Sequence, residues 1–279
     1  MKNRLFVVNK LIGTSSNFYL RKIKRKYKQK KAGFSGTLDP FASGCLIVAF
    51  DQYTKLFNYL NKTPKTYTAT IWLGVHSDSL DNENITILDK NPKKLNIENI
   101  QNSIEELHGS IEYLPPKYSA KKIDGQRAYN LARNGVDVQM KKSIMQVYNI
   151  KLLNYSHPFI SFEATVSEGA YIRSLAQILL EKLNSKGTLS SLKRLNEGKF
   201  IFDNEKALDP LQYLNLEQNI YTGDEQWIDL GKKIDINYLE NKNDGEYLLV
   251  FEKFFSIIKI EEGVVTYSLN KIQRDTDVH

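Results

Sequence analysis

Short apolar runs, bounded by polar or turn-forming residues, recur through the first 170 residues of the chain and predict strands. Leu5–Val8 and Leu46–Phe50 are such runs. Thr66–Leu73 alternates between apolar and polar positions, which predicts a strand with one apolar face. Two longer stretches, Ile144–Tyr155 and Phe159–Ser167, predict a strand pair joined by a tight turn.

Apolar residues spaced three or four positions apart predict the helices. The first helix begins at Ser15 or Ser16, and Leu20, Ile23 and Tyr27 form its apolar stripe. The other helices are predicted at Lys55–Leu60, Ile97–Leu107, Ala128–Arg133 and about Tyr171–Leu183.

Val75–Pro92 is polar and is predicted to be a loop. Its acids Asp78, Asp81 and Glu83 are spaced loosely like those of a calcium-binding loop, but the glycine and the terminal glutamate of that motif are missing. We therefore interpret these acids as a solvated acidic turn.

The composition changes near residue 203. Residues 201–270 contain 14 acids and only six lysines. Tyr247–Phe251, Phe254–Ile260 and Val264–Leu269 predict a small antiparallel β unit. Residues 203–279 are therefore predicted to form a small acidic C-terminal β domain, separate from a larger domain over residues 1–202. The acidity of this tail argues against its being the main surface for a polyanion.

The overall composition is that of an ordinary globular chain, with 279 residues, 41% hydrophobic and 25% charged. No apolar run is long enough for a membrane helix. The single cysteine, Cys45, cannot form an internal disulfide and fits a reducing cytoplasm. The four histidines show no metal-ligand spacing, and no glycine-rich phosphate-binding motif is present. We expect neither a metal nor a nucleotide cofactor.

The basic residues are concentrated in two regions. The first fifty residues hold eleven Lys or Arg and one acid, whereas the whole chain carries a net charge of +7. Pro115–Lys142 is a second basic stretch, predicted to be an extended arm or an inserted hairpin. Such regions attract nucleic acid. The residues expected to bind RNA are Lys10, Arg21, Lys22, Lys24, Arg25, Lys28, Lys30, Lys31, Lys117, Lys121, Lys122, Arg127 and Arg133.

The one acid of the basic N-terminus, Asp39, lies in the segment GFSGTLDPFASG at Gly33–Gly44. Glycines let a backbone turn tightly and approach a ligand, and Pro40 fixes the chain just after the carboxylate. Phosphates would repel a carboxylate at a nucleic-acid-binding surface, so an acid at this position needs a function of its own. We therefore interpret Asp39 as a reactive group on a rigid turn. The alternative is an aspartate that only caps the next element.

Three further clusters accompany this turn. They are Tyr67 on a predicted strand, Tyr171 and Arg173 in SEGAYIRSL, and Leu192 with Arg194 in LSSLKRL. Taken singly, each has an ordinary structural explanation, as a core tyrosine, a surface ion pair or a packed leucine.

Taken together, GxSGTLDPxAxGxL, KxY, GxYIRSLA and SLKRL, in this order, resemble the B-type tRNA pseudouridine synthases, the TruB family, over Leu5 to Phe202. The resemblance implies an α+β pseudouridine-synthase fold with a central, mostly antiparallel mixed sheet flanked by helices. Residues 1–202 would be the catalytic domain, with a tRNA-gripping insertion at about 115–142. The tail would be a divergent PUA-like β domain.

The resemblance also implies an activity, isomerisation of the T-loop uridine conventionally numbered 55, with tRNA as partner and no cofactor. Asp39 would be the nucleophile, Arg173 its ionic partner, Tyr67 a stacking platform, and Tyr171 a residue beside the base. Gly36, Thr37, Leu192 and Phe34 would form the substrate pocket. The family usually has histidine where this chain has Phe34, which keeps a flat stacking face worth about 1–3 kcal/mol per base but cannot hydrogen-bond.

Two alternatives stay open at the level of sequence. One is a non-catalytic tRNA-binding or tRNA-folding protein on the same scaffold, which the replacement at Phe34 would suit. The other is a related isomerase that acts on another RNA or within a multi-protein particle. The presence of Asp39, Tyr67, Tyr171 and Arg173 favours the enzyme, and the long basic arm and the self-contained length favour a tRNA enzyme that acts alone. We expect a monomer, because the sequence has no clear coiled-coil seam.

Overall fold

The computed structural model describes residues 3–275 except 120, 124, 135, 137 and 138. Its main element is a nine-stranded sheet in the order β1-β3-β12-β4-β11-β10-β7, with β2 beside β3 and β13 beside β12. All pairs are antiparallel except β12 with β3, which confirms the predicted mostly antiparallel mixed sheet. The strands are β1 (Arg4–Lys10), β2 (Ala32–Ser35), β3 (Ala42–Phe50), β4 (Lys65–Leu73), β7 (Gly109–Tyr113), β10 (Ser143–Ser156), β11 (Phe159–Val166), β12 (Gly187–Glu197) and β13 (Phe200–Ile201).

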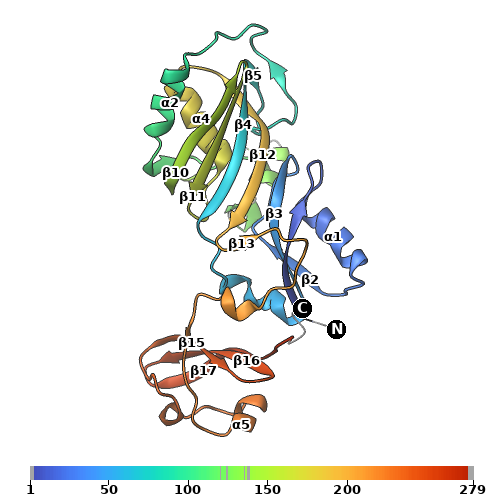
Figure 1. Cartoon of the computed structure of the whole chain (residues 1–279), viewed down its shortest axis with the longest axis vertical. Coiled ribbons are helices and arrows are strands. Elements are labelled where there is room, and N and C mark those ends of the chain that lie inside the picture. The colour runs from blue at the N-terminus through green and yellow to red at the C-terminus, as the bar shows by residue number, and fades with distance from the viewer. Residues whose placement is uncertain (1–2, 120, 124, 135, 137–138, 276–279) are drawn as a thin grey trace.

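Helices cover this sheet at two places (Figure 1). Helices α2 (Ile97–Glu105) and α4 (Ile172–Lys182) lie against the end formed by β4, β10, β11 and β12, while α1 (Ser16–Lys26) lies beside β2 and β3. Ser15 caps α1 by accepting a hydrogen bond from Phe18 N, as the predicted start requires. The predicted helix at Lys55–Leu60 is instead a 3-10 helix, η1 (Asp51–Asn58).

The predicted apolar face of β4 lies in the largest core. Tyr67, Ala69, Ile71 and Leu73 are all buried there, between the sheet and helices α2 and α4. A smaller cluster holds α1 on the sheet, where Ile23 packs against Phe6, Val8 and Phe50. Together these two cores hold the strands on either side of the segment between β2 and β3, and Leu38 and Phe41 of that segment belong to the larger core.

Short elements occupy the segment predicted to be a loop and the basic arm predicted to be extended or a hairpin. Residues 75–92 contain the strand pair β5 (Val75–His76) and β6 (Thr86–Ile87). The basic arm contains the hairpin β8 (Lys122–Ile123) and β9 (Gln126–Arg127), followed by α3 (Ala128–Arg133), so the short helix predicted there is present.

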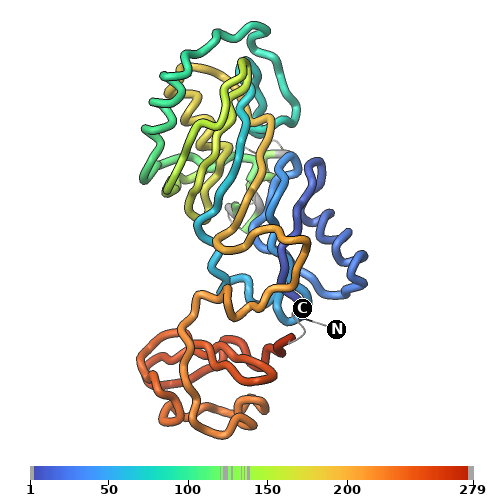
Figure 2. The backbone as a smooth tube through the Cα atoms, in the orientation of Figure 1, coloured from blue at the N-terminus to red at the C-terminus, as the bar shows by residue number. Residues whose placement is uncertain are grey.

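The tail forms a second, four-stranded sheet in the order β14-β15-β16-β17, and the three predicted strands are among them. Figure 2 shows that the end of the C-terminal sheet lies beside the N-terminal part of the chain. Asn3 Nδ2 donates a hydrogen bond to Gln273 O there, at 2.9 Å. The remaining elements are β14 (Glu217–Gln218), β15 (Gly245–Val250), β16 (Phe254–Glu261), β17 (Val264–Gln273), α5 (Glu225–Asp229), η2 (Pro210–Gln212) and η3 (Ile236–Tyr238).

Candidate active site

A cavity of about 530 Å³ opens at residues 36–41, between β2 and β3, which we call the Asp39 turn. Strands β4, β7, β10 and β12, the basic arm, and the segment that leads into α4 with the start of that helix contribute the rest of its wall. The predicted site residues that line it are Gly36, Thr37, Asp39, Tyr67, Lys121, Tyr171, Arg173 and Leu192. Segments far apart in the sequence therefore meet at one place.

Hydrogen bonds hold the Asp39 turn in place. The Ser16 hydroxyl, in the first turn of α1, accepts from Leu38 N at 3.0 Å and donates to Leu38 O at 2.9 Å. Gly13 N donates to Pro40 O at 2.9 Å. Gly36 has a φ of +68°, which favours glycine. The turn thus presents Asp39 in a defined orientation, and α1 supports it from behind.

Arg173 holds the Asp39 carboxylate from α4. Its Nη2 lies 2.9 Å from Asp39 Oδ2, and its side chain is only 3% exposed. Two backbone carbonyls orient the guanidinium, because Nη1 donates to Ser79 O at 2.7 Å and Nη2 to Tyr118 O at 2.9 Å. The ion pair that the resemblance implies is therefore present, in a fixed geometry.

A second acid, Asp81, belongs to this site and was not expected from the sequence. Its Oδ2 lies 3.8 Å from Arg173 Nη1, and the side chain is 6% exposed. Ser79 Oγ and Glu83 N donate to Asp81 Oδ1. The interpretation of Asp81 as part of a solvated acidic turn is wrong, because the chain folds this carboxylate inward against the arginine.

The charges around Asp39 act in opposite directions on its pKa. Burial raises the pKa of Asp39 above its usual range, and the neighbouring Asp81 raises it further. Arg173 and Lys10 lower it, but the net shift is upward. The two cationic neighbours thus offset part of the upward shift that burial and Asp81 cause in the pKa of Asp39.

The sequence predicts that Lys10, at the end of β1, binds RNA phosphates, but the structure buries its side chain. It is 0% exposed, and its ammonium donates to Thr14 O at 2.7 Å and Leu11 O at 3.0 Å. Burial lowers the pKa of Lys10 to about 8, with Asp39 acting against that shift and Arg194 adding to it. Lys10 is therefore a buried cation behind the Asp39 turn, and the prediction of a phosphate contact is corrected.

Aromatic and apolar side chains form the rest of the wall. Tyr67 and Leu192 project from β4 and β12 and are 7% and 6% exposed. Tyr171 precedes α4, and its ring centroid lies 6.3 Å from that of Tyr113. Tyr113 was not predicted as a site residue, since nothing in the sequence links β7 to the motifs. Burial, with a contribution from Tyr171, raises the pKa of Tyr113 to about 12, so this phenol stays neutral.

Phe34 does not line the cavity, contrary to the prediction. It lies on β2 opposite Val48 of β3, and its half-buried ring packs against the core beneath α1. The alternation of β2 directs this side chain to the α1 side, whereas the turn that follows leads to the cavity.

The predicted basic residues fall into three groups. Six on or after α1 are exposed: Arg21, Lys22, Arg25, Lys28, Lys30 and Lys31, with Lys24 half-buried beside them. In the arm, Lys117 is exposed, and Lys121 Nζ donates to Ser143 Oγ at 2.8 Å at the rim of the cavity. The side chains of Lys122, Arg127 and Arg133 lie outside what the structure describes.

Among the described residues, no group of three or more His, Cys, Asp or Glu side chains is arranged to hold a metal ion. Within the same part of the chain, no helix combines the length and the apolar character needed to cross a bilayer.

Comparison with known proteins identifies a family. Residues 24–172 match the model of the TruB family pseudouridylate synthases, N-terminal domain. The chain is 54% identical over 272 residues to the tRNA pseudouridine synthase B of Campylobacter concisus (strain 13826), which covers 98% of this chain and 99% of the relative. It is 52% identical over 275 residues to the tRNA pseudouridine synthase B of Sulfurovum sp. (strain NBC37-1), with 99% of each chain covered.

A solved structure shares the fold. A chain from the crystal structure of a Cbf5-Nop10-Gar1 complex superposes with a TM-score of 0.65 at 18% identity, covering 97% of this chain and 84% of that chain. At this identity the similarity concerns the fold alone.

Proposed function

Because the chain belongs to the TruB family and isomerises uridine to pseudouridine in tRNA, we propose that its target is the T-loop uridine conventionally numbered 55. The single observation that carries the site assignment is the Asp39–Arg173 ion pair at the cavity wall. The family membership favours this enzyme over a non-catalytic tRNA-binding protein on the same scaffold.

In the proposed reaction the target nucleotide leaves the loop stack and enters the cavity. Extrusion costs a few kcal/mol, which stacking on the buried ring of Tyr67 and contact with Leu192 would offset. A volume of about 530 Å³ is ample for one nucleoside. Gly36 and Thr37 would contact the sugar side of this nucleotide, since they line the cavity on the Asp39 turn.

Asp39 would then act as the nucleophile that assists cleavage of the N-glycosidic bond. It must be ionised to do so, and Arg173 supports this because it lies 2.9 Å away and lowers the pKa that burial raises. The base rotates, the bond that Asp39 made is released as C5 bonds to ribose C1′, and C5 loses a proton while N1, freed by the cleavage, gains one, so the reaction is a net isomerisation. We assign the relay of this proton from C5 to Tyr171, which lines the cavity beside Arg173.

Binding of tRNA would rest on two basic surfaces, the exposed face of α1 and the arm over residues 115–142. Exposure of Arg21, Lys22 and Arg25 supports the first, and the position of Lys121 at the cavity rim supports the second. These cations would neutralise phosphates of the T-arm. Residues 1–202 would form the catalytic domain and residues 203–279 a divergent PUA-like β domain, acting as a monomer in the cytoplasm.

Replacing Asp39 with Asn tests the nucleophile. We expect Asp39→Asn to bind unmodified tRNA transcript with its affinity retained and to form no pseudouridine, because the amide cannot supply the carboxylate charge. Chemical mapping of pseudouridine reports both the rate and the position. Asp78→Asn is the matched control, since this aspartate is 85% exposed and pairs only with His76 in the described contacts.

Turnover by Asp39→Asn above about a hundredth of the wild-type rate, or about 2.7 kcal/mol of lost transition-state stabilisation, would end the assignment. A product at a position outside the T-loop would contradict the proposed target while leaving the family activity intact.

A further inference from the structure

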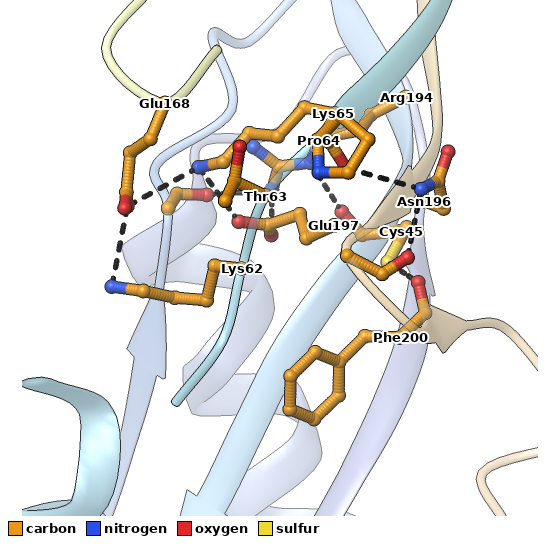
Figure 3. Close-up of polar contacts among 12 residues, drawn as sticks. Cys45, Lys62, Thr63, Pro64, Lys65, Glu168, Arg194, Asn196, Glu197 and Phe200 are labelled. Atoms are coloured by element: carbon orange, nitrogen blue, oxygen red, sulfur yellow. Dashed lines mark hydrogen bonds and ion pairs between the residues drawn. The ribbon is translucent and has the colours of Figure 1, made fainter. Parts of the chain in front are cut away.

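A fully buried carboxylate lies beneath the cavity, between two cations (Figure 3). Glu197, the last residue of β12, has a side chain that is 0% exposed. Its Oε1 lies 2.8 Å from Arg194 Nη2, and its Oε2 lies 2.9 Å from Lys65 Nζ. Both cations line the cavity, whereas Glu197 lies behind them.

An irregularity in β12 brings this triad together. Arg194 is opposite Tyr67 of β4 and Glu197 is opposite Lys65, with a register shift between Arg194 and Asn196. In a regular strand, residues three apart point to opposite faces. The extra residue at the bulge lets Arg194 and Glu197 point to the same side, and bulges often re-aim side chains next to active sites.

Arg194 connects the triad to the reactive turn. It is 2% exposed, its Nη2 donates to Gly36 O at 2.6 Å, and its Nε donates to Cys45 O at 2.8 Å. Burial acts to lower the pKa of Arg194, but Glu197 and the hydroxyl of Tyr67, which accepts a hydrogen bond from it, raise the pKa above its usual value. One guanidinium thus contacts the Asp39 turn, β3 and the proposed stacking residue.

The Asp39 turn also rests directly on the carboxylate. A Cβ at Gly36 would lie only 2.5 Å from Glu197 Oε2. Gly36 is three residues from Asp39 and is the first residue of the turn, so its position sets where the turn begins. The carboxylate therefore leaves no room for a side chain at Gly36 and packs closely beneath this end of the turn.

We propose that Glu197 is a positioning residue for the isomerisation. It fixes Arg194 and Lys65 beneath the cavity, and Arg194 in turn holds the Gly36 end of the Asp39 turn and the Tyr67 hydroxyl. Without this charge, Arg194 would be a buried cation without its ionic partner Glu197, and Lys65 would keep the longer contact to Glu168 Oε1 at 3.6 Å, so both cations would be less firmly held. The inference rests on the proposed role of Asp39. It adds that Glu197, a residue outside the cavity, keeps the Asp39 turn in the position that catalysis needs.

The test separates binding from chemistry. We expect Glu197→Gln to slow single-turnover pseudouridine formation by about tenfold or more, because small misplacements of reacting groups are costly, while tRNA affinity changes less than about twofold. Glu197→Asp keeps the charge and should recover most of the rate. Glu163→Gln is the control, because Glu163 pairs with Lys151 at 2.8 Å on β11 and does not line the cavity.

A Glu197→Gln variant that folds and turns over at the wild-type rate would overturn the proposal, as would equal losses in Glu197→Gln and Glu197→Asp. Should Glu197→Gln fail to fold, Arg194→Lys provides the second test, because lysine keeps the charge but lacks the planar fork that reaches both Gly36 O and Cys45 O. We expect a slow rate with tRNA affinity retained, and a wild-type rate there would equally reject the idea. Activity in Asp39→Asn, assayed in parallel, would reject the role of Asp39 separately.

Discussion

Four charged side chains from four separate segments meet at the Asp39 turn. Asp39 contacts Arg173, Asp81 contacts the other side of the same guanidinium, and Lys10 lies behind the turn. Two acids and two cations cancel in formal charge, and pairing each acid with the guanidinium offsets part of the cost of burying these charges. The site is therefore a charge network in which Asp39 and Arg173 line the cavity, while Asp81 and Lys10 lie behind them.

Lys10 makes a measurable contribution to this network through the pH dependence of stability. Burial lowers its pKa from 10.5 to about 8 in the folded protein. Between these values the unfolded chain binds more protons, so the free energy of unfolding rises with pH. From pH 7 to pH 9.5 we expect a gain of about 2 kcal/mol in the wild type that Lys10→Met lacks.

Urea unfolding of both proteins at the two pH values measures this difference, and Lys22→Met, at an exposed position on α1, controls for the loss of a lysine. If the difference in the free energy of unfolding between the wild type and Lys10→Met stays constant with pH, then Lys10 keeps its proton throughout this range.

At the scale of elements, regular patterns were predictable from the sequence and irregular ones were not. The alternation in β4 and the stripe of α1 identified both elements. Strand β12 was not predicted, because register shifts at Leu189/Ser191 and Arg194/Asn196 break its period of two. The same break hid the pairing of Arg194 with Glu197, although Arg194 itself lay in a recognised motif.

The site shows the same limit. Asp39, Tyr67, Tyr171 and Arg173 were found through motifs, and they line one cavity. Asp81 was missed because its motif-free loop gives no sign that its carboxylate turns inward. A lysine at the surface and a lysine in the interior look alike in a basic segment, which is why Lys10 was assigned to RNA.

Helix α1 supplies the first test of the RNA-binding surface. Arg21, Arg25 and Lys28 line a shallow hollow on its exposed side. We expect Arg21→Gln combined with Arg25→Gln to reduce the slope of log affinity for tRNA against log salt by about 1.5, because each lost phosphate contact removes somewhat less than one unit. The rate at saturating tRNA should stay unchanged.

Filter-binding titrations at several salt concentrations give this slope. Lys233→Gln combined with Lys242→Gln is the control, since it removes two exposed lysines from the acidic tail. An equal change of slope in both double variants would mean that α1 contributes only general charge and makes no local contact.

At the scale of the whole molecule, the two sheets share a core. Leu248 and Phe255 of the C-terminal sheet pack with Leu5, Ile47 and other buried residues of β1, β3 and η1. The shift to acidic composition predicted a separate small domain, but composition says nothing about which face of a strand is covered. The shared core places the C-terminal sheet in direct contact with β3, the strand that follows the Asp39 turn, so we expect the two sheets to stabilise each other.

Neighbouring phenylalanines on β16 allow this coupling to be tested. Phe255 is 0% exposed and lies in the shared core, whereas Phe254 is 3% exposed and lies in the core internal to the C-terminal sheet. Each substitution by alanine should cost about 3–5 kcal/mol. In scanning calorimetry we expect one unfolding transition for the wild type. We also expect one transition for Phe254→Ala, because this substitution weakens the C-terminal sheet but leaves the shared core intact. Phe255→Ala weakens the shared core itself, so the two sheets of this variant should unfold in separate transitions, the C-terminal sheet first. Two transitions already present in the wild type would show that the parts unfold independently.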